Sequence, residues 1–288
     1  MSKKSLFDSD DDSGGIDHSG YAWSVGSSNI YLHVDSYAKG GTPGRPGSGG
    51  GGGTGGTTPA PYTSGDPSVL DSQEFNVKVV FQTGNWTDSL IQGFKDAADA
   101  ISSFIKGDIP DSSYNGQYVD DITISAALVT IDGPGKILGS SGPDLLRGGS
   151  YFPIHATMQF DIADASTYDS MGLMNDIDLH EMLHGVGFGT IWSYKGLVAG
   201  ANTLTPTFIG AQATAYYDAN GGVGSPRVEE GYGSGTALAH WDEQTFGSEL
   251  MTGFINNPDT FSYMTVASLG DLGYSIVDVL HYTAPAFI

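Results

Sequence analysis

The sequence of 288 residues contains no cysteine. This absence excludes disulfides, thiolate metal ligands and a cysteine nucleophile, so any metal site must be built from His, Asp and Glu. Basic residues are scarce as well: 11 Lys and Arg stand against 33 Asp and Glu, which gives a formal net charge of -22. Such a charge repels phosphate backbones and anionic membrane surfaces, and nucleic acid is therefore not expected as a partner.

Long apolar runs are also missing. No stretch approaches the roughly 20 apolar residues that cross a bilayer as a helix, so we expect no membrane span. The first residues, MSKKSLFDSDDDSGG, pass into acid and glycine instead of an apolar core of about 7 to 15 residues, so no secretory leader is visible. The sequence carries no signal for a particular oligomeric state.

Composition divides the chain near residue 71. Residues 40–56, GGTPGRPGSGGGGGTGG, have the composition of a flexible linker. Upstream of it, DSDDDSGG is too polar to fold, whereas residues 20–38 hold enough aromatic side chains for a short strand or a docking segment. We predict that residues 1–71 are a disordered acidic and glycine-rich region, in which 20–38 are either a propeptide or an unstructured tail. Residues 72–288 are predicted to form one domain.

Hydrophobic periodicity in this domain predicts both strands and helices. Strands are expected in three segments, at residues 75–81, 121–128 and 154–160. Glycine-rich turns are expected at 133–149. Apolar residues at steps of four and three predict a helix that begins near Thr87 or Asp88 and ends at Gly107. This order of elements favours an α/β or α+β layout.

The segment HEMLHGVGFGTIW carries the clearest chemical signal. It overlaps residues 173–186, where the apolar pattern predicts a largely buried helix that ends at Gly185 and Gly187. Residues four apart on a helix project about 40° from each other and lie about 6 Å apart along the axis. His180 and His184 can therefore offer two imidazoles to one ion. With seven histidines in the chain, roughly 0.003 such motifs are expected by chance.

Glu181 is turned by about 100° from His180 on this helix and is not placed to bind the ion directly. Its carboxylate can deprotonate a zinc-bound water, whose pKa is lowered to roughly 7, and pass the proton to a leaving amine. Catalytic zinc sites of this kind use three protein ligands. A histidine six residues after His184 would complete the most compact pattern, but Thr190 stands there.

The third ligand must therefore come from elsewhere in the chain. The remaining histidines are His18, His33, His155, His240 and His281. His240 lies in ALAHWDEQTFGSELMTGF, a segment with further likeness to a metal site. Carboxylates are the alternatives, because Glu229, Glu230 or Glu249 would complete a His₂Glu site and Asp242 a His₂Asp site.

Three segments resemble leishmanolysin-type zinc metallopeptidases of the metzincin clan, particularly their bacterial relatives: LHEMLHGVGFGTIW, AHWDEQTFGSELMTG and MTVASLGDLGY. A looser likeness includes YFPIHATMQFDIADAS. In that family an insertion separates the second and third histidines. The resemblance implies that His240 is the third ligand, 56 residues after His184, and that Met251 forms the Met-turn beneath the metal. The parasite enzymes have many cysteines and a further C-terminal domain, so a shorter, bacterial-like form is expected here.

The resemblance also implies a fold and a function. The fold is α+β, with a mixed twisted sheet and the active-site helix in a subdomain at about 72–187. A mostly irregular C-terminal subdomain at about 188–288 carries the Met-turn and a final helix at 264–272. The implied function is a zinc endopeptidase with one catalytic Zn²⁺, acting on protein or peptide substrates. The alternative is a catalytically silent, zinc-stabilised surface or binding protein. Secretion or cell-surface display without a visible leader is expected, with a cytoplasmic location as the alternative.

Other residues carry secondary hypotheses. Strand 154–160 is either a substrate-binding edge or an ordinary core strand, and His155 within it is expected to be structural. Phe254 follows the Met-turn, and the next tyrosine, Tyr263, is not expected to stabilise an oxyanion. Either a Ca²⁺ site or a solvated loop would explain three neighbouring acids, Asp161, Asp164 and Asp169. Groups that could block the zinc site in a latent form lie upstream: Asp17, His18, His33 and Asp35.

Overall fold

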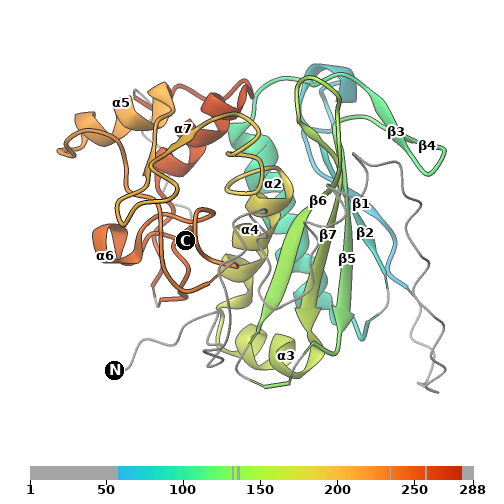
Figure 1. Cartoon of the computed structure of the whole chain (residues 1–288). Helices are drawn as coiled ribbons and strands as arrows, with labels where there is room; N and C mark the ends of the chain where they lie inside the picture. Colours follow the sequence, from blue (N-terminus) through green and yellow to red (C-terminus); the bar gives the residue numbers. More distant parts are fainter. Residues whose placement is uncertain are drawn as a thin grey trace.

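The computed structural model describes residues 58–280, apart from 83, 132, 135, 136, 234 and 257. The linker, the segment 20–38 and the upstream groups of the latency hypothesis lie outside the described residues, as does His281. In the described residues, a sheet with neighbouring helices is followed by a C-terminal part rich in loops (Figure 1). The prediction of an α+β fold with a mixed sheet is confirmed.

The main sheet has five strands in the order β1-β2-β5-β7-β6. They are β1 (Tyr62–Thr63), β2 (Val77–Phe81), β5 (Ile122–Val129), β6 (Gly139–Leu146) and β7 (Pro153–Asp161). Strands β2, β5 and β7 run parallel, whereas β1 and β6 are antiparallel to their neighbours. Strand β1 falls within residues 1–71, so this short stretch is part of the sheet and not disordered as predicted.

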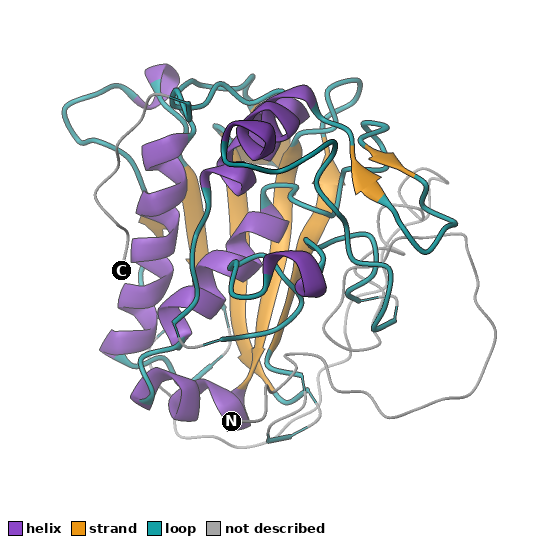
Figure 2. Cartoon of the chain, turned by 90° about the vertical axis from the view of Figure 1, so that its left-hand side faces the viewer, coloured by secondary structure: helices purple, strands orange, loops and turns teal. Residues whose placement is uncertain are grey.

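Helices α2 (Asp88–Phe104) and α4 (Met174–Gly185) cover one face of the sheet (Figure 2). Successive strand residues point to opposite faces, and most of those that face the helices are apolar and buried, with Ser141 of β6 as a polar exception against α4. On α2, the ring of Phe94 lies 5.4 Å from the ring of Phe160 on β7. A Cβ on Gly185 of α4 would lie 3.4 Å from side-chain atoms of Ile124 and Ala156. The motif helix therefore rests directly on the sheet.

The start of α2 agrees with its prediction, whereas its end does not. Thr87 accepts the backbone N–H of Leu90 in its hydroxyl oxygen at 3.2 Å and caps the helix. The last helical residue is Phe104, three residues before the predicted end at Gly107. Ile105 is already extended and fully buried, and it forms a β-bridge with Ile276. Tertiary pairing, and not a glycine cap, ends this helix.

The edge of the sheet differs from the prediction. Residues 133–149 are expected to be turns, but part of them forms β6, which pairs with β7 on its outer side. The predicted edge strand 154–160 therefore lies inside the sheet, and the edge interpretation of it is wrong. Glycine, proline and aspartate are depleted in strands, so the segment GSSGPDLL is not predicted to be one. Pro143 is tolerated because β6 is an edge strand with irregular register there.

Smaller elements complete the described chain. Before α4 these are η1 (Asp71–Gln73), β3 (Ser112–Tyr114), β4 (Gln117–Val119) and α3 (Ile162–Ser170). After it come β8 (Val198–Ala199), β9 (Thr207–Phe208), α5 (Ala211–Ala219), α6 (Glu243–Phe246) and α7 (Tyr263–Leu272). Helix α7 matches the predicted final helix, whereas α5 and α6 are not predicted. Across the described ranges, every helix is too short or too polar to cross a membrane.

Candidate metal centre

Three imidazoles that are far apart in the sequence converge in the structure. His180 and His184 project from α4 one turn apart, and His240 reaches them from the segment that precedes α6. The Nε2 atom of His180 lies 3.1 Å from that of His184 and 3.3 Å from that of His240. All three side chains are buried, and together they form a group that could hold a metal ion. The structure thus brings together the three histidines named from the sequence.

Each imidazole is oriented by a hydrogen bond from its other ring nitrogen. The Nδ1 atoms donate to backbone carbonyls at 2.8, 2.9 and 3.0 Å, in the pairs His180–Leu250, His184–Phe188 and His240–Thr236. A carbonyl oxygen only accepts, so each Nδ1 carries the hydrogen. The three Nε2 atoms therefore present lone pairs toward one another, which is the arrangement found in metal-binding histidines.

Burial keeps these imidazoles neutral. It lowers the pKa of His180 to about 4. It lowers the pKa of His184 and His240 well below the usual value, and the neighbouring imidazoles lower both further. Neutral imidazole is the form that binds a metal ion, so the group is ready to do so at neutral pH.

The spacing of the Nε2 atoms fits a tetrahedral ion. Nitrogen ligands about 2.0 to 2.1 Å from zinc are about 3.3 to 3.4 Å apart in a tetrahedron, and the separations found here are 3.1 and 3.3 Å. Lone pairs at this distance repel one another, and a cation among them removes the repulsion. A donor set of three imidazoles suits zinc better than Ca²⁺ or Mg²⁺, which prefer oxygen ligands. The residues present therefore fit a zinc ion.

Glu181 follows His180 on α4 and is only 3% exposed. Its Oε2 atom has no hydrogen-bond partner within the part of the chain that the structure describes. Burial raises the pKa of this carboxyl well above its usual range. A cation at the imidazoles would lower that pKa again, because it favours the charged form. Burial and a bound cation thus act on the pKa of Glu181 in opposite directions.

A turn at residues 249–251 contacts both parts of the site. The carbonyl of Leu250 accepts the Nδ1 hydrogen of His180, and the carbonyl of Met251 accepts the backbone N–H of Trp241 at 3.0 Å. Trp241 directly follows His240. Met251 is fully buried in this turn. Met251 thus lies in the turn whose backbone contacts His180 and Trp241, and its role as a Met-turn stays a prediction.

Glu249, one of the alternative third ligands, holds this turn instead. Its Oε2 accepts the backbone N–H of Met251 at 2.5 Å, and its Oε1 accepts the hydroxyls of Ser262 at 2.7 Å and Thr265 at 2.6 Å. The Thr265 hydroxyl oxygen in turn accepts the indole N–H of Trp241 at 2.9 Å. This buried network ties the turn to α7. Nothing in the sequence alone distinguishes such an anchor from a metal ligand.

The other carboxylates considered as the third ligand interact with protein groups away from the imidazoles. Glu229 and Asp242 accept backbone N–H groups of nearby residues, and Glu230 forms an ion pair with Arg227 at 3.2 Å. These three acids form a group of their own, separate from the group of imidazoles. None of them completes the site of His180 and His184, so the structure favours His240 over its alternatives.

A buried aromatic cluster returns the chain to the site after the long excursion that follows α4. The rings of Phe188 and Trp192 lie 4.7 Å apart, and those of Trp192 and Trp241 lie 5.1 Å apart. Phe208 closes the cluster at 5.4 Å from Trp241. Aromatic contacts of this kind add to the gain from burial. Since Trp241 follows His240, the cluster fixes the third imidazole, although the sequence alone does not show that these rings meet.

Gly189 permits the close approach of the two segments that carry the histidines. Its φ is +71°, and a Cβ at this position would lie 2.2 Å from the carbonyl oxygen of Ala239. Any larger residue would push Ala239, and with it His240, away from α4. The next residue, Thr190, donates its hydroxyl to the carbonyl of His184 at 2.9 Å. Thr190 stands where the compact motif would have its third ligand, and here its hydroxyl binds a carbonyl at the end of α4 instead.

His155 lies on the face of the sheet opposite α4, because its neighbour Ala156 faces that helix. Its Nδ1 pairs with Asp144 at 2.7 Å and its Nε2 with the hydroxyl of Ser125 at 2.9 Å. The ring of Tyr114 stacks on it, with centroids 3.8 Å apart. His155 is therefore separated from the metal centre by the sheet, as expected of a structural residue.

The three acids of the calcium hypothesis, Asp161, Asp164 and Asp169, do not form a cluster in the described residues. Asp161 accepts the backbone N–H of Ala163 at 2.8 Å and caps α3, while Asp169 accepts the hydroxyl of Ser89 at 2.7 Å. Among the described residues, these acids and Asp164 do not form a group that could hold an ion.

Comparison with known proteins gives a partial similarity. No protein-family model matches the chain. A leishmanolysin-like peptidase of Drosophila pseudoobscura pseudoobscura is 35% identical to it over 71 residues. The match covers 25% of this chain and 10% of that protein. The chain is thus similar over a quarter of its length to a leishmanolysin-like peptidase, and it contains three histidines that could hold a metal ion.

Proposed function

We propose that the protein is a zinc-dependent endopeptidase of the leishmanolysin type within the metzincin clan. The observation that carries the proposal is the group of three neutral Nε2 atoms, 3.1 and 3.3 Å apart, on His180, His184 and His240. Three protein ligands leave one position of a tetrahedral ion open, as in catalytic zinc sites. The similarity to a leishmanolysin-like peptidase supports the same class of enzyme.

The residues around the site divide the chemistry between them. A zinc ion in such a site activates a water molecule and polarises the carbonyl of the bound peptide. Glu181 would accept a proton from the attacking water at its Oε2 and deliver it to the nitrogen of the leaving amine. Burial of this carboxylate strengthens these interactions by lowering the local dielectric constant. Met251 would support the imidazoles from below without binding the ion.

Two features favour an endopeptidase over a catalytically silent zinc protein. A purely structural zinc site closes its fourth position with a protein ligand and needs no general base. In the described chain, the group of imidazoles contains three side chains, and Glu181 lies next to it on α4 with an Oε2 that no other described group binds. A catalytic site accounts for both observations.

Metal content and proteolysis, measured together, test the proposal. The wild-type protein should bind zinc and cleave an unfolded protein substrate. Glu181→Gln should retain the zinc but lose about 10²- to 10⁴-fold in turnover, because the base alone is removed. His240→Ala should lose both zinc and activity. Glu230→Gln is the matched control, since Glu230 lies at the surface beside Arg227 and should leave both properties unchanged.

The outcomes are distinct. Undiminished turnover in Glu181→Gln would refute the role of that carboxylate. Full zinc occupancy and activity in His240→Ala would place the third ligand elsewhere. Zinc binding without any cleavage by the wild type would favour the silent binding protein.

A further inference from the structure

Three polar side chains form a row across the sheet, on the face opposite α4. Ser125 lies on β5, His155 on the neighbouring strand β7, and Asp144 on the edge strand β6. The hydroxyl oxygen of Ser125 lies 2.9 Å from Nε2 of His155. The Nδ1 atom of the same ring lies 2.7 Å from a carboxylate oxygen of Asp144. Helices α2 and α4 cover the other face of the sheet (Figure 2), so this row is separate from the metal centre.

The two hydrogen bonds of His155 fix its tautomer. A carboxylate only accepts hydrogen bonds, so Nδ1 carries the hydrogen and donates it to Asp144. Nε2 therefore has a lone pair, which accepts the hydroxyl hydrogen of Ser125. In this order of serine, imidazole and carboxylate, the histidine can remove the proton of the serine and make it a nucleophile.

Further contacts hold the imidazole and the carboxylate in place. The second carboxylate oxygen of Asp144 accepts the hydroxyl of Thr157 at 2.8 Å. The ring of Tyr114 is stacked on that of His155, with the centroids 3.8 Å apart and the planes 7° from parallel. The register of β6 is irregular at Asp144, and such irregularities re-aim side chains and are common beside active sites. The imidazole therefore has a fixed orientation toward Ser125.

Solvent reaches the serine of this row more readily than the histidine. Ser125 is half-buried, whereas the side chain of His155 is only 3% exposed. On the same face, Val80 of β2 lies opposite Ser125, and Ala127 follows two positions later on β5. Neither neighbour carries a charge or a long side chain. The surroundings of the hydroxyl therefore suit a small, uncharged substrate.

We propose that Ser125, His155 and Asp144 form a second catalytic site, independent of metal, which hydrolyses small carboxylic esters. The Oγ atom of Ser125 bonds to the carbonyl carbon of the ester, and its proton passes to Nε2 of His155. The bond to the leaving alcohol then breaks, and the alcohol oxygen takes that proton. Water next attacks the acyl group on Ser125 and gives its proton to the same Nε2. The acid leaves, and the proton returns to the serine oxygen.

The position of the serine within the sheet explains why esters are the expected substrates. Strand β5 pairs with β2 on one side and with β7 on the other, so the backbone N–H groups beside Ser125 are committed to the sheet. They are not free to bind an oxyanion, and loss of one such donor costs a serine peptidase about 10²- to 10³-fold in turnover. An ester needs this help less than a peptide does, because an alcohol leaves more readily than an amine.

Covalent labelling of the full-length protein with a fluorophosphonate tests the site. Ser125 should displace fluoride and carry one phosphonyl group, which mass spectrometry of the peptides locates. The label should form in the presence of a chelator, and equally in Glu181→Gln, because the metal centre takes no part. Ser125→Ala should lose the label and, with it, the hydrolysis of p-nitrophenyl acetate. His155→Gln should slow labelling about 10²- to 10⁴-fold, because the base is removed.

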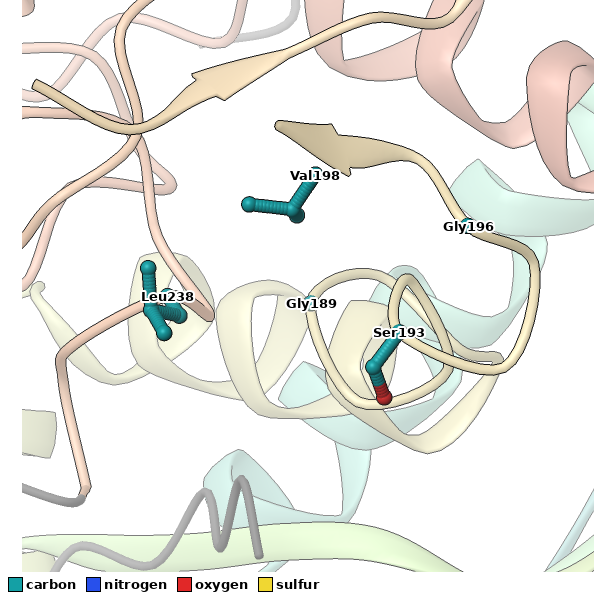
Figure 3. A pocket seen from close by; sticks show the side chains of 5 residues that line it. All are labelled: Gly189, Ser193, Gly196, Val198 and Leu238. Carbon is teal, nitrogen blue, oxygen red and sulfur yellow. The ribbon is translucent and has the colours of Figure 1, made fainter. Parts of the chain in front are cut away.

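Two further variants make the result specific. Asp144→Asn keeps an acceptor beside Thr157 but no longer holds the imidazole in the required tautomer, so labelling should slow about 10²- to 10⁴-fold. Ser193→Ala is the control. Ser193 is exposed, and Figure 3 shows it at the wall of a cavity with Gly189 and Leu238, beside segments of the metal centre. This control should be labelled as fast as the wild type.

Circular dichroism identifies the variants that are folded, and rates are compared among those. Three results would overturn the inference: a wild type that takes no label, a label on a residue other than Ser125, or a rate that stays at the wild-type value in His155→Gln and Asp144→Asn. The last result would show that the row of hydrogen bonds only stabilises the sheet. None of these results bears on the zinc peptidase, because labelling is measured without metal.

Discussion

The imidazole of His180 donates a hydrogen bond of 2.8 Å to the carbonyl of Leu250, across 70 positions of the sequence. The next carbonyl in the same turn, that of Met251, accepts the backbone N–H of Trp241. One turn thus orients the imidazole of His180 and holds Trp241, the residue that follows His240. The geometry of the metal centre therefore depends on a segment that contributes no ligand to it.

The first prediction concerns the anchor of this turn. Glu249→Gln replaces a carboxylate that accepts four hydrogen bonds with an amide, which has one acceptor oxygen and an N–H₂ group that faces donors. We expect the free energy of unfolding to fall by about 1 to 3 kcal/mol. Affinity for zinc should fall about tenfold or more, because the support of His180 is loosened. Urea denaturation and competitive zinc titration measure the two effects.

Glu230→Gln is the control for that substitution. The exposed pair of Glu230 and Arg227 should contribute less than about 1 kcal/mol, and it does not touch the turn. Equal losses in the two variants would show that Glu249 has no special role in the site.

A second prediction concerns the contact between Gly189 and Ala239. Gly189→Ala should abolish zinc binding and destabilise the protein, because its Cβ would lie 2.2 Å from a backbone oxygen. Gly116→Ala is matched in backbone conformation, with a φ of +75°, but its Cβ would meet no atom within 4 Å. The control should lose about 1 kcal/mol from the positive φ alone and keep full zinc affinity. Zinc titration of both variants distinguishes the steric effect from the conformational one.

The metal centre is only partly readable from the sequence. The spacing of His180 and His184 on a helix predicts their approach, because helical geometry is local. No local rule places His240, and its selection depended on resemblance to a known family. The role of Glu249 is harder still, since its partners are set by packing between the turn and α7. From the sequence alone, Glu249 could equally be a metal ligand or an anchor of the turn.

In the fold as well, some elements can be predicted from the local sequence, whereas others depend on tertiary packing. Strands β2, β5 and β7 are rich in β-branched or apolar residues and are predicted to within two residues at either end. Strand β6 is missed because its residues have little intrinsic preference for a strand and its conformation comes from pairing with β7. That omission also led to the wrong edge of the sheet. Local preference predicts central strands, whereas edges depend on tertiary partners.

A third prediction follows from the fully buried side chain of Asp178 on α4. Neither of its carboxylate oxygens has a hydrogen-bond partner among the described residues. Burial raises its pKa well above 3.8, and the charge of Glu181 raises it further. A raised pKa means that the folded state binds a proton more tightly than the unfolded state does. Stability from this group is therefore complete below about pH 3.8 and is lost as the pH rises through the folded pKa.

Asp178→Asn removes this titration. At pH 8 the variant should be more stable than the wild type by about 1 to 3 kcal/mol, and the difference should shrink toward pH 4. Asp218→Asn, at an exposed position of α5, should show no such trend. Urea denaturation across this pH range provides the measurement. A difference that does not change with pH would contradict the assignment of a raised pKa to Asp178.

The last prediction concerns addition and removal of the metal. A ligand that binds only the folded state stabilises it by about 2.7 kcal/mol at a hundredfold excess over its Kd. For a domain of this size, zinc should therefore raise the Tm of the metal-free protein by about 5 to 11 °C, and a chelator should reverse the change. Mg²⁺ and Ca²⁺ should not replace zinc at this site, because the three imidazoles offer no oxygen ligands. His240→Gln should lose the response to zinc. The control is His155→Gln, which alters a buried histidine on the opposite face of the sheet. This control should have a lower Tm but should still be stabilised by zinc. A response to zinc that survives in His240→Gln would show that the ion binds elsewhere.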